Sequence, residues 1–182
     1  MLNNLVGIYG VSAPVSTNSY ESIATANGTG SSNTITFSSI PSTYKHLQVR
    51  IYSLATGTPD WISLKINADT TTTNYRMHHI YGDGTSAVAQ SIQGGSYTPI
   101  QFMLGGSTTQ PAVAVADFLD YSNTNKNSVV RTLQGWDTNG DGKIAFESIL
   151  WMNTATISEL EFRIYSSNFA TATKFALYGI KG

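Results

Sequence analysis

Cysteine is absent from this sequence, and charged residues are scarce, at 12% of 182 residues. Without cysteine the chain can form no disulfide bond, so its stability must come from packing or from assembly. The charged fraction lies well below the value of about 25% that is usual for soluble proteins. Serine, threonine, asparagine and glycine take the place of the missing charges. This composition is typical of a protein made soluble by hydroxyl and amide groups, or of one whose surface meets other subunits.

An excess of either charge is absent too, because 10 Lys and Arg oppose 11 Asp and Glu, for a net charge of −1. This balance excludes electrostatic attraction as a basis for binding nucleic acid or an anionic membrane, so neither is expected as a partner.

Long apolar runs are also missing. The N-terminal stretch "MLNNLVGIYGVSAPV" is broken by glycine and proline and has no early basic residue. We therefore expect neither a signal peptide nor a membrane span, and a soluble protein.

Alternation of apolar and polar residues dominates the rest of the chain, as in strands that bury one face. In "HLQVRIYS", Leu47, Val49 and Ile51 point to one side and the residues between them point to the other. The segments "WISLKIN" and "SELEFRIYS" repeat this pattern. We expect strands at residues 20–26, 34–37, 45–53, 61–67, 100–104, 113–119, 128–134, 144–151, 158–166 and 174–180.

Glycine-rich turns separate these strands, and the best helical candidate is the short segment "SAVAQSI", residues 86–92. Many short strands joined by such turns predict an all-β fold, an antiparallel β-sandwich. A jelly roll is favoured over an immunoglobulin-like sandwich, because the Cys–Trp–Cys core of the latter is missing. We expect an extended N-terminal arm at residues 1–18 and a β-sandwich domain at residues 19–182.

The arm has apolar side chains but too many glycine, proline and polar residues for a regular element. One interpretation is a frayed terminus. We favour an extended arm that lies on a neighbouring subunit, because apolar residues in a free tail would reduce solubility. The anchoring residues would be Leu2, Leu5, Val6, Ile8 and Tyr9.

The segment "DTNGDGK" has the beginning of a calcium-binding loop, with Asp137, Asn139 and Asp141 at positions one, three and five. Position twelve of an EF-hand loop is a bidentate glutamate, whereas here it is Ser148, and Glu147 comes one residue early. The flanking segments are strand-like, and "NG" followed by "DG" is a strong hairpin signal. We therefore predict a hairpin turn and no metal cofactor. A calcium ion held by the acidic turn alone is the alternative.

Histidine and carboxylate residues do not form a recognisable catalytic or zinc motif. His78 and His79 are adjacent, so in a strand they would point to opposite faces, and His46 lies far away in the sequence. All three are expected at the surface or rim. Asp117 and Asp120 are scattered acids, and the sequence has no nucleophile elbow, metalloprotease helix or phosphate loop. We expect no enzymatic activity and no cofactor.

Aromatic residues could stack on sugars, since jelly rolls often serve as lectins. Trp151 lies in the apolar segment "SILWMN", which predicts a place in the core. Trp61 begins an expected strand, and Trp136 precedes the acidic turn. These two could bind a sugar or anchor a subunit interface.

From Tyr20 onward the sequence resembles a group of small structural proteins of tailed bacteriophages. The resemblance is carried, in order, by "SYESIATA", "FSSIPSTYKHLQVR", "NYRMHHIYGDG", "VADFLDYSNTNK", "GWDTNGDGKIAFES", "LWMNTATISELEF" and "FALYGIKG". Proteins of this kind are β-sandwich virion components, found as decoration or cement proteins of the capsid or as parts of the tail. The resemblance implies a structural role in a virion, without giving the part of the virion.

We therefore expect a capsid decoration or cement protein. It would bind the major capsid protein on the outer capsid surface after synthesis in the host cytoplasm, and would associate with itself as a homotrimer. The alternative is a tail-fibre or receptor-binding module that recognises host surface glycans. Only about 18 residues precede the sandwich, fewer than the shaft of a receptor-binding tip would need.

Overall fold

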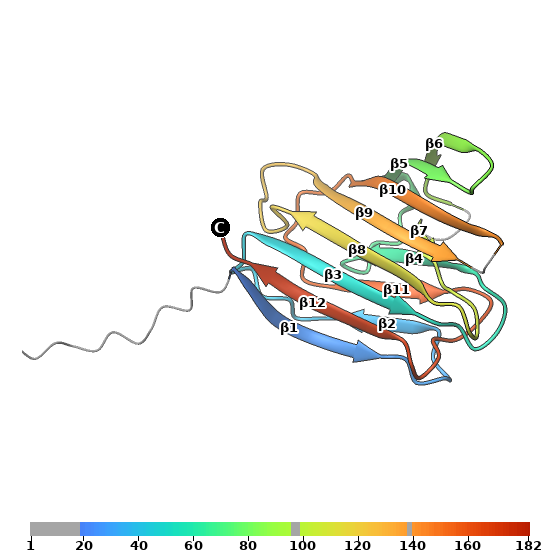
Figure 1. Cartoon of the computed structure of the whole chain (residues 1–182). Helices are drawn as coiled ribbons and strands as arrows, with labels where there is room; N and C mark the ends of the chain where they lie inside the picture. The colour runs from blue at the N-terminus through green and yellow to red at the C-terminus, as the bar shows by residue number, and fades with distance from the viewer. Residues whose placement is uncertain (1–18, 96–98, 138–139) are drawn as a thin grey trace, which may run out of the picture.

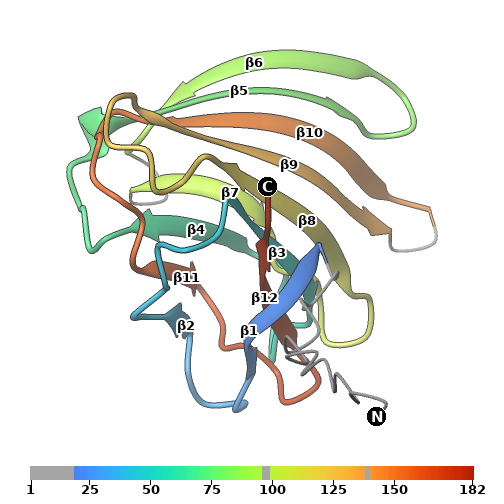
Figure 2. The same cartoon turned by 90° about the vertical axis from the view of Figure 1, so that its left-hand side faces the viewer.

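The computed structural model describes residues 19–95, 99–137 and 140–182. Two antiparallel sheets face each other as the layers of a sandwich (Figure 2). The larger sheet has eight strands in the order β1-β12-β3-β8-β9-β10-β5-β6, and the smaller has four in the order β2-β11-β4-β7 (Figure 1). The strands are β1 (Tyr20–Asn27), β2 (Thr34–Phe37), β3 (His46–Ser53), β4 (Trp61–Ile66), β5 (Tyr75–Gly82), β6 (Ala87–Gln93), β7 (Ile100–Leu104), β8 (Ala112–Leu119), β9 (Ser128–Asp137), β10 (Gly142–Trp151), β11 (Leu160–Ile164) and β12 (Lys174–Ile180).

The strand order is that of a jelly roll with two added hairpins. Without β5–β6 and β9–β10, two four-stranded sheets remain, β1-β12-β3-β8 and β2-β11-β4-β7. The chain then alternates between the sheets, except for the step from β4 to β7, and its first strand pairs with its last. Both hairpins extend the same edge of the larger sheet. The prediction of an antiparallel β-sandwich of jelly-roll type is confirmed.

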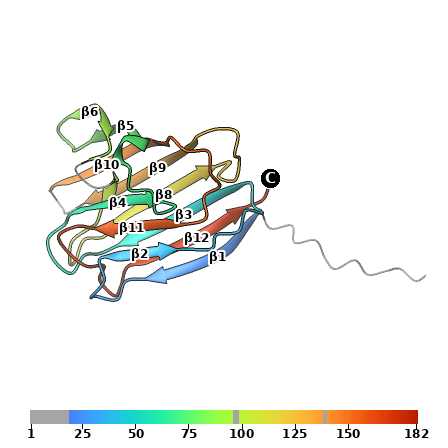
Figure 3. The same ribbon diagram turned by 180° about the vertical axis from the view of Figure 1, so that it is seen from behind.

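The added hairpins reach beyond the smaller sheet. Figure 3, seen from the side of the smaller sheet, shows β5 and β6 projecting past β4. The residues of β6 are exposed or half-buried, whereas most inward residues of β5, β9 and β10 are buried. We call β5, β6, β9 and β10 the overhang.

Strand β6 covers most of residues 86–92, the segment that was the best helical candidate in the sequence. It pairs with β5 along its whole length, from Arg76 opposite Gln93 to Gly82 opposite Ala87. The turn between them is closed by Asp83, whose carboxylate accepts backbone N–H bonds from Thr85 and Ser86 at 2.9 and 2.8 Å. Pairing with a neighbouring strand outweighs the weak helical preference of this short segment.

The core lies between the two sheets and continues under the overhang, where Met77, Val130 and Ile149 belong to the same buried cluster. Leu47, Val49 and Ile51 of β3 point inward and are buried, as predicted. Phe162 of β11 is central, with its ring centroid 5.3 Å from that of Phe102 and 5.1 Å from that of Phe175. These contacts join the two sheets through aromatic packing.

The only helix in the described part of the chain is a single 3-10 turn, η1 (Thr72–Asn74). No helix in residues 19–95, 99–137 and 140–182 has the length and apolar character needed to cross a membrane. The predicted arm at residues 1–18, with its anchors Leu2, Leu5, Val6, Ile8 and Tyr9, lies outside the described residues. Its role stays a prediction.

Candidate functional site

A pocket of about 210 Å³ lies under the overhang, where the inner faces of β5, β6, β9 and β10 meet the β4–β7 edge of the smaller sheet. Each strand contributes alternate residues, because successive side chains of a strand point to opposite faces. The walls combine aromatic rings with polar groups, and we call this the inner pocket. Its chemically distinctive residues are Trp61, His79, Tyr81, Trp136, Lys143 and Glu147.

The most deeply buried charged group of the inner pocket is the carboxylate of Glu147, which is 1% exposed. Its Oε2 accepts a hydrogen bond from Thr132 Oγ1 at 3.2 Å, and its Oε1 lies 3.5 Å from His79 Nδ1. On the other side of the imidazole, His79 Nε2 lies 3.1 Å from Gln90 Oε1. A chain of polar contacts thus joins β9, β10, β5 and β6.

The His79–Glu147 pair brings two buried titratable groups together. The neighbouring Glu147 carboxylate raises the pKa of His79, against the effect of burial. Burial raises the pKa of Glu147, against the effect of His79 and of the hydrogen bond from Thr132. Each partner compensates the charge of the other, as a pair at this depth requires.

Aromatic rings surround the ammonium group of Lys143 at the other side of the inner pocket. The Nζ atom lies 4.9 Å from the ring centroid of Tyr81 and 5.9 Å from that of Trp61, both within cation–π range. Trp136 also lines the inner pocket. Its indole N–H is buried and has no hydrogen-bond partner among the described residues. An unpaired buried donor is costly and is rare in folded proteins.

A second surface lies on the outside of the larger sheet. Strand pairing places Val115, Leu133, Phe146 and Ile80 side by side in one row across β8, β9, β10 and β5. In the next row, Val113 and Ile144 flank Gly135. These six apolar residues are all at least 38% exposed. We call them the outer band.

A shallow hollow of about 560 Å³ crosses the outer band at Gly135, because glycine has no side chain to fill the space between its neighbours. The row on the other side of the band is polar. It contains Asp117, Arg131, Ser148 and His78, and Asp117 accepts a hydrogen bond from Gln48 of β3 at 2.9 Å. The apolar surface is therefore a continuous strip with a polar border, and it is not a scatter of single residues.

The acidic segment is a hairpin turn, as predicted. β9 and β10 pair in antiparallel register, with Gly142 opposite Asp137, so strands flank the turn where an EF-hand would have helices. Asp141 accepts a bond from the backbone N–H of Gly142 at 2.8 Å. Asn139 lies outside the described residues. Within the described ranges, no group of three or more His, Asp or Glu residues is placed to hold a metal ion.

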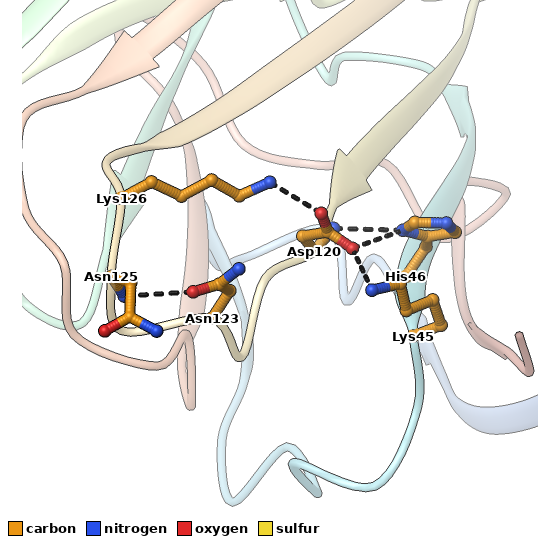
Figure 4. A network of polar contacts seen from close by, with 6 residues as sticks. All are labelled: Lys45, His46, Asp120, Asn123, Asn125 and Lys126. Atoms are coloured by element: carbon orange, nitrogen blue, oxygen red, sulfur yellow. Dashed lines mark hydrogen bonds and ion pairs between the residues drawn. The ribbon is translucent and has the colours of Figure 1, made fainter.

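Asp120 joins the turn after β8 to the start of β3 (Figure 4). Its carboxylate lies 2.5 Å from Lys126 Nζ and 2.7 Å from Lys45 Nζ, and its backbone N–H donates to His46 Nδ1 at 2.9 Å. These cations, Lys126 first, lower the pKa of Asp120 to about 2. Asp117 points to the outer face instead and binds Gln48. These acids therefore serve as structural contacts.

The histidines and tryptophans singled out in the sequence lie in different environments in the structure. His78 and His79 point to opposite faces, as predicted, but the expectation that every histidine lies at the surface or rim is wrong for His79, which is buried. Trp151 lies in the core, as predicted, and its indole N–H donates to Asp69 at 2.9 Å. Trp61 and Trp136 both line the inner pocket.

Sequence reasoning missed Tyr81, Gln90, Lys143 and Glu147 as pocket residues. A signal for Glu147 was present, because it stands in phase with Ile149 and Trp151 on the inward side of β10. A carboxylate on the apolar side of a strand needs a partner in the fold.

Comparison with known proteins adds no relative: no protein-family model, curated protein or solved structure matches this chain.

Proposed function

We propose that this protein is a structural component of a virion, a decoration protein that binds the major capsid protein on the outer capsid surface. The observation that carries the proposal is the outer band, an exposed apolar strip across four paired strands. Monomeric soluble proteins seldom leave a continuous apolar surface in water, and such surfaces mark sites of protein association. The choice of the major capsid protein as the partner rests on the resemblance of the sequence to small phage structural proteins.

The mechanism is mass action. A protein that binds the assembled shell and not the free subunits adds its binding free energy to the stability of the shell. Association as a homotrimer would strengthen attachment further, because two subunits remain bound while the third dissociates. No catalytic step is part of this function.

Substitutions within the outer band test the proposal directly. Leu133→Ser combined with Phe146→Ser should abolish sedimentation of the protein with capsids that lack it. The matched control is Val129→Ser, a change on the same face of β9 outside the band, and it should leave attachment intact. Equal attachment of the band variant and the control would contradict the proposal. Gel densitometry of purified virions gives the copy number, which should be in the hundreds for a decoration protein.

The arm is a second, separate element of attachment. Deleting residues 1–16 should leave the sandwich folded and weaken binding to the shell. Full decoration of capsids by the truncated protein would show that the arm has no anchoring role.

The alternative, a tail module that recognises host glycans, depends on a different surface, the inner pocket. A copy number of a few dozen or fewer would favour this alternative.

A further inference from the structure

The inner pocket is distinguished by buried titratable groups. Buried polar residues of the jelly-roll interior, such as Ser53 and Thr173, carry hydroxyl groups, whereas the inner face of the overhang buries His79, Gln134 and Glu147. Packing alone does not require these groups, since apolar residues of similar volume stabilise an interior as well as a buried ion pair does. Buried titratable groups that converge on a concave site are typical of ligand binding.

The aromatic walls indicate the kind of ligand. Trp61, Tyr81 and Trp136 bring three rings to a single small pocket. The face of an aromatic ring is electron-rich, so it attracts cations and weakly positive C–H groups. The aliphatic face of a pyranose ring presents such C–H groups, and its hydroxyl groups require hydrogen-bonding partners at the edges. Gln101 and the amide nitrogen of Gln90 can supply hydrogen bonds at those edges, and the His79–Glu147 pair holds Gln90 through its amide oxygen.

We propose that the inner pocket binds one sugar ring, the terminal residue of a neutral glycan. The volume of about 210 Å³ falls below the range of about 300–1,000 Å³ found for drug-sized ligands, so the pocket suits a single ring. A neutral ligand is favoured because His79 and Glu147, the two buried titratable groups of the pocket, compensate each other. This inference is independent of the proposed function, since the outer band lies on the opposite face of the same sheet.

The three tryptophans allow a direct test by NMR of the indole ¹⁵N–H groups in the full-length protein. The probes are glucose, galactose, mannose, rhamnose, N-acetylglucosamine and N-acetylgalactosamine, titrated into the millimolar range. At least one should shift the Trp61 and Trp136 signals saturably. The Trp151 signal should stay in place, because its N–H is bonded to Asp69 in the core. Absence of a saturable Trp61 or Trp136 shift for all six sugars would overturn the proposal.

Variants assign the binding to the pocket. Tyr81→Ala should weaken the affinity for the active sugar by about tenfold, because a stacking surface is lost. The control is Tyr52→Ala, which removes an exposed ring from the outer face and should leave the affinity unchanged. Both variants should keep the wild-type amide spectrum elsewhere. Unchanged affinity of folded Tyr81→Ala would place the sugar elsewhere and overturn the proposal, as would saturable binding of glucuronic or sialic acid alone.

Discussion

The larger sheet has two halves that use the same backbone pattern for different purposes. In the jelly-roll half, β1, β12, β3 and β8 pack apolar side chains on the smaller sheet. In the overhang, β9, β10, β5 and β6 turn His79, Thr132 and Glu147 toward the same side of the sheet. The first arrangement gains stability from burial, and the second uses buried polar groups that need partners. The buried polar groups of the overhang therefore mark the part of the interior that we propose as a binding site.

The largest expected effect concerns the jelly-roll half. Phe162→Ala removes the ring that packs on Phe102 and Phe175, and should lower the free energy of unfolding by about 4 kcal/mol. Ile92→Ala is the matching change in the overhang and should cost only about 1 kcal/mol, because that side chain is half-buried. Urea unfolding followed by circular dichroism measures both. Equal losses would show that Ile92 contributes as much to stability as the central ring of Phe162.

The same contrast explains which parts of the fold could be predicted. β3, β4 and β11 alternate apolar and polar residues because one side packs in the core, and they were identified from sequence. β5 was not predicted as a strand. Its inward side carries His79 beside Met77, so the alternation of apolar and polar residues does not show which face is buried. The segment of β6, which was the best helical candidate, was not predicted as a strand either. The alternation signal is therefore weakest where the inner pocket lies.

The location of the candidate site could be predicted only in part. Trp61 and Trp136 were recognised as possible sugar contacts, but their meeting depends on the pairing of Ala112 with Trp136 and on the β4–β7 pairing, which join distant segments. The outer band could not be predicted from the sequence for a similar reason. Val115, Leu133, Phe146 and Ile80 are far apart in the sequence and become neighbours only through strand register.

The polar interior of the overhang should respond differently to single and paired changes. Glu147→Ala leaves His79 buried without its carboxylate and should cost about 3 kcal/mol of stability. Replacing both residues by leucine removes the need for a charge partner, so the double variant should be at least as stable as the wild type. Urea midpoints of the single and double variants check this. A double variant as unstable as Glu147→Ala would show that the pair is required for folding.

The smallest expected effect is the pH dependence contributed by Asp120, at the end of the jelly-roll half. Its folded pKa of about 2 lies below the ordinary value of 3.8, so its ion pairs stabilise the fold fully above about pH 4. That stabilisation is lost as the pH falls from about 4 toward 2. Asp120→Asn should flatten the decline of the urea midpoint over this window, and Lys126→Met should do so to a lesser degree because Lys45 remains. Identical acid profiles for wild type and Asp120→Asn would show that the contacts of Figure 4 add no stability.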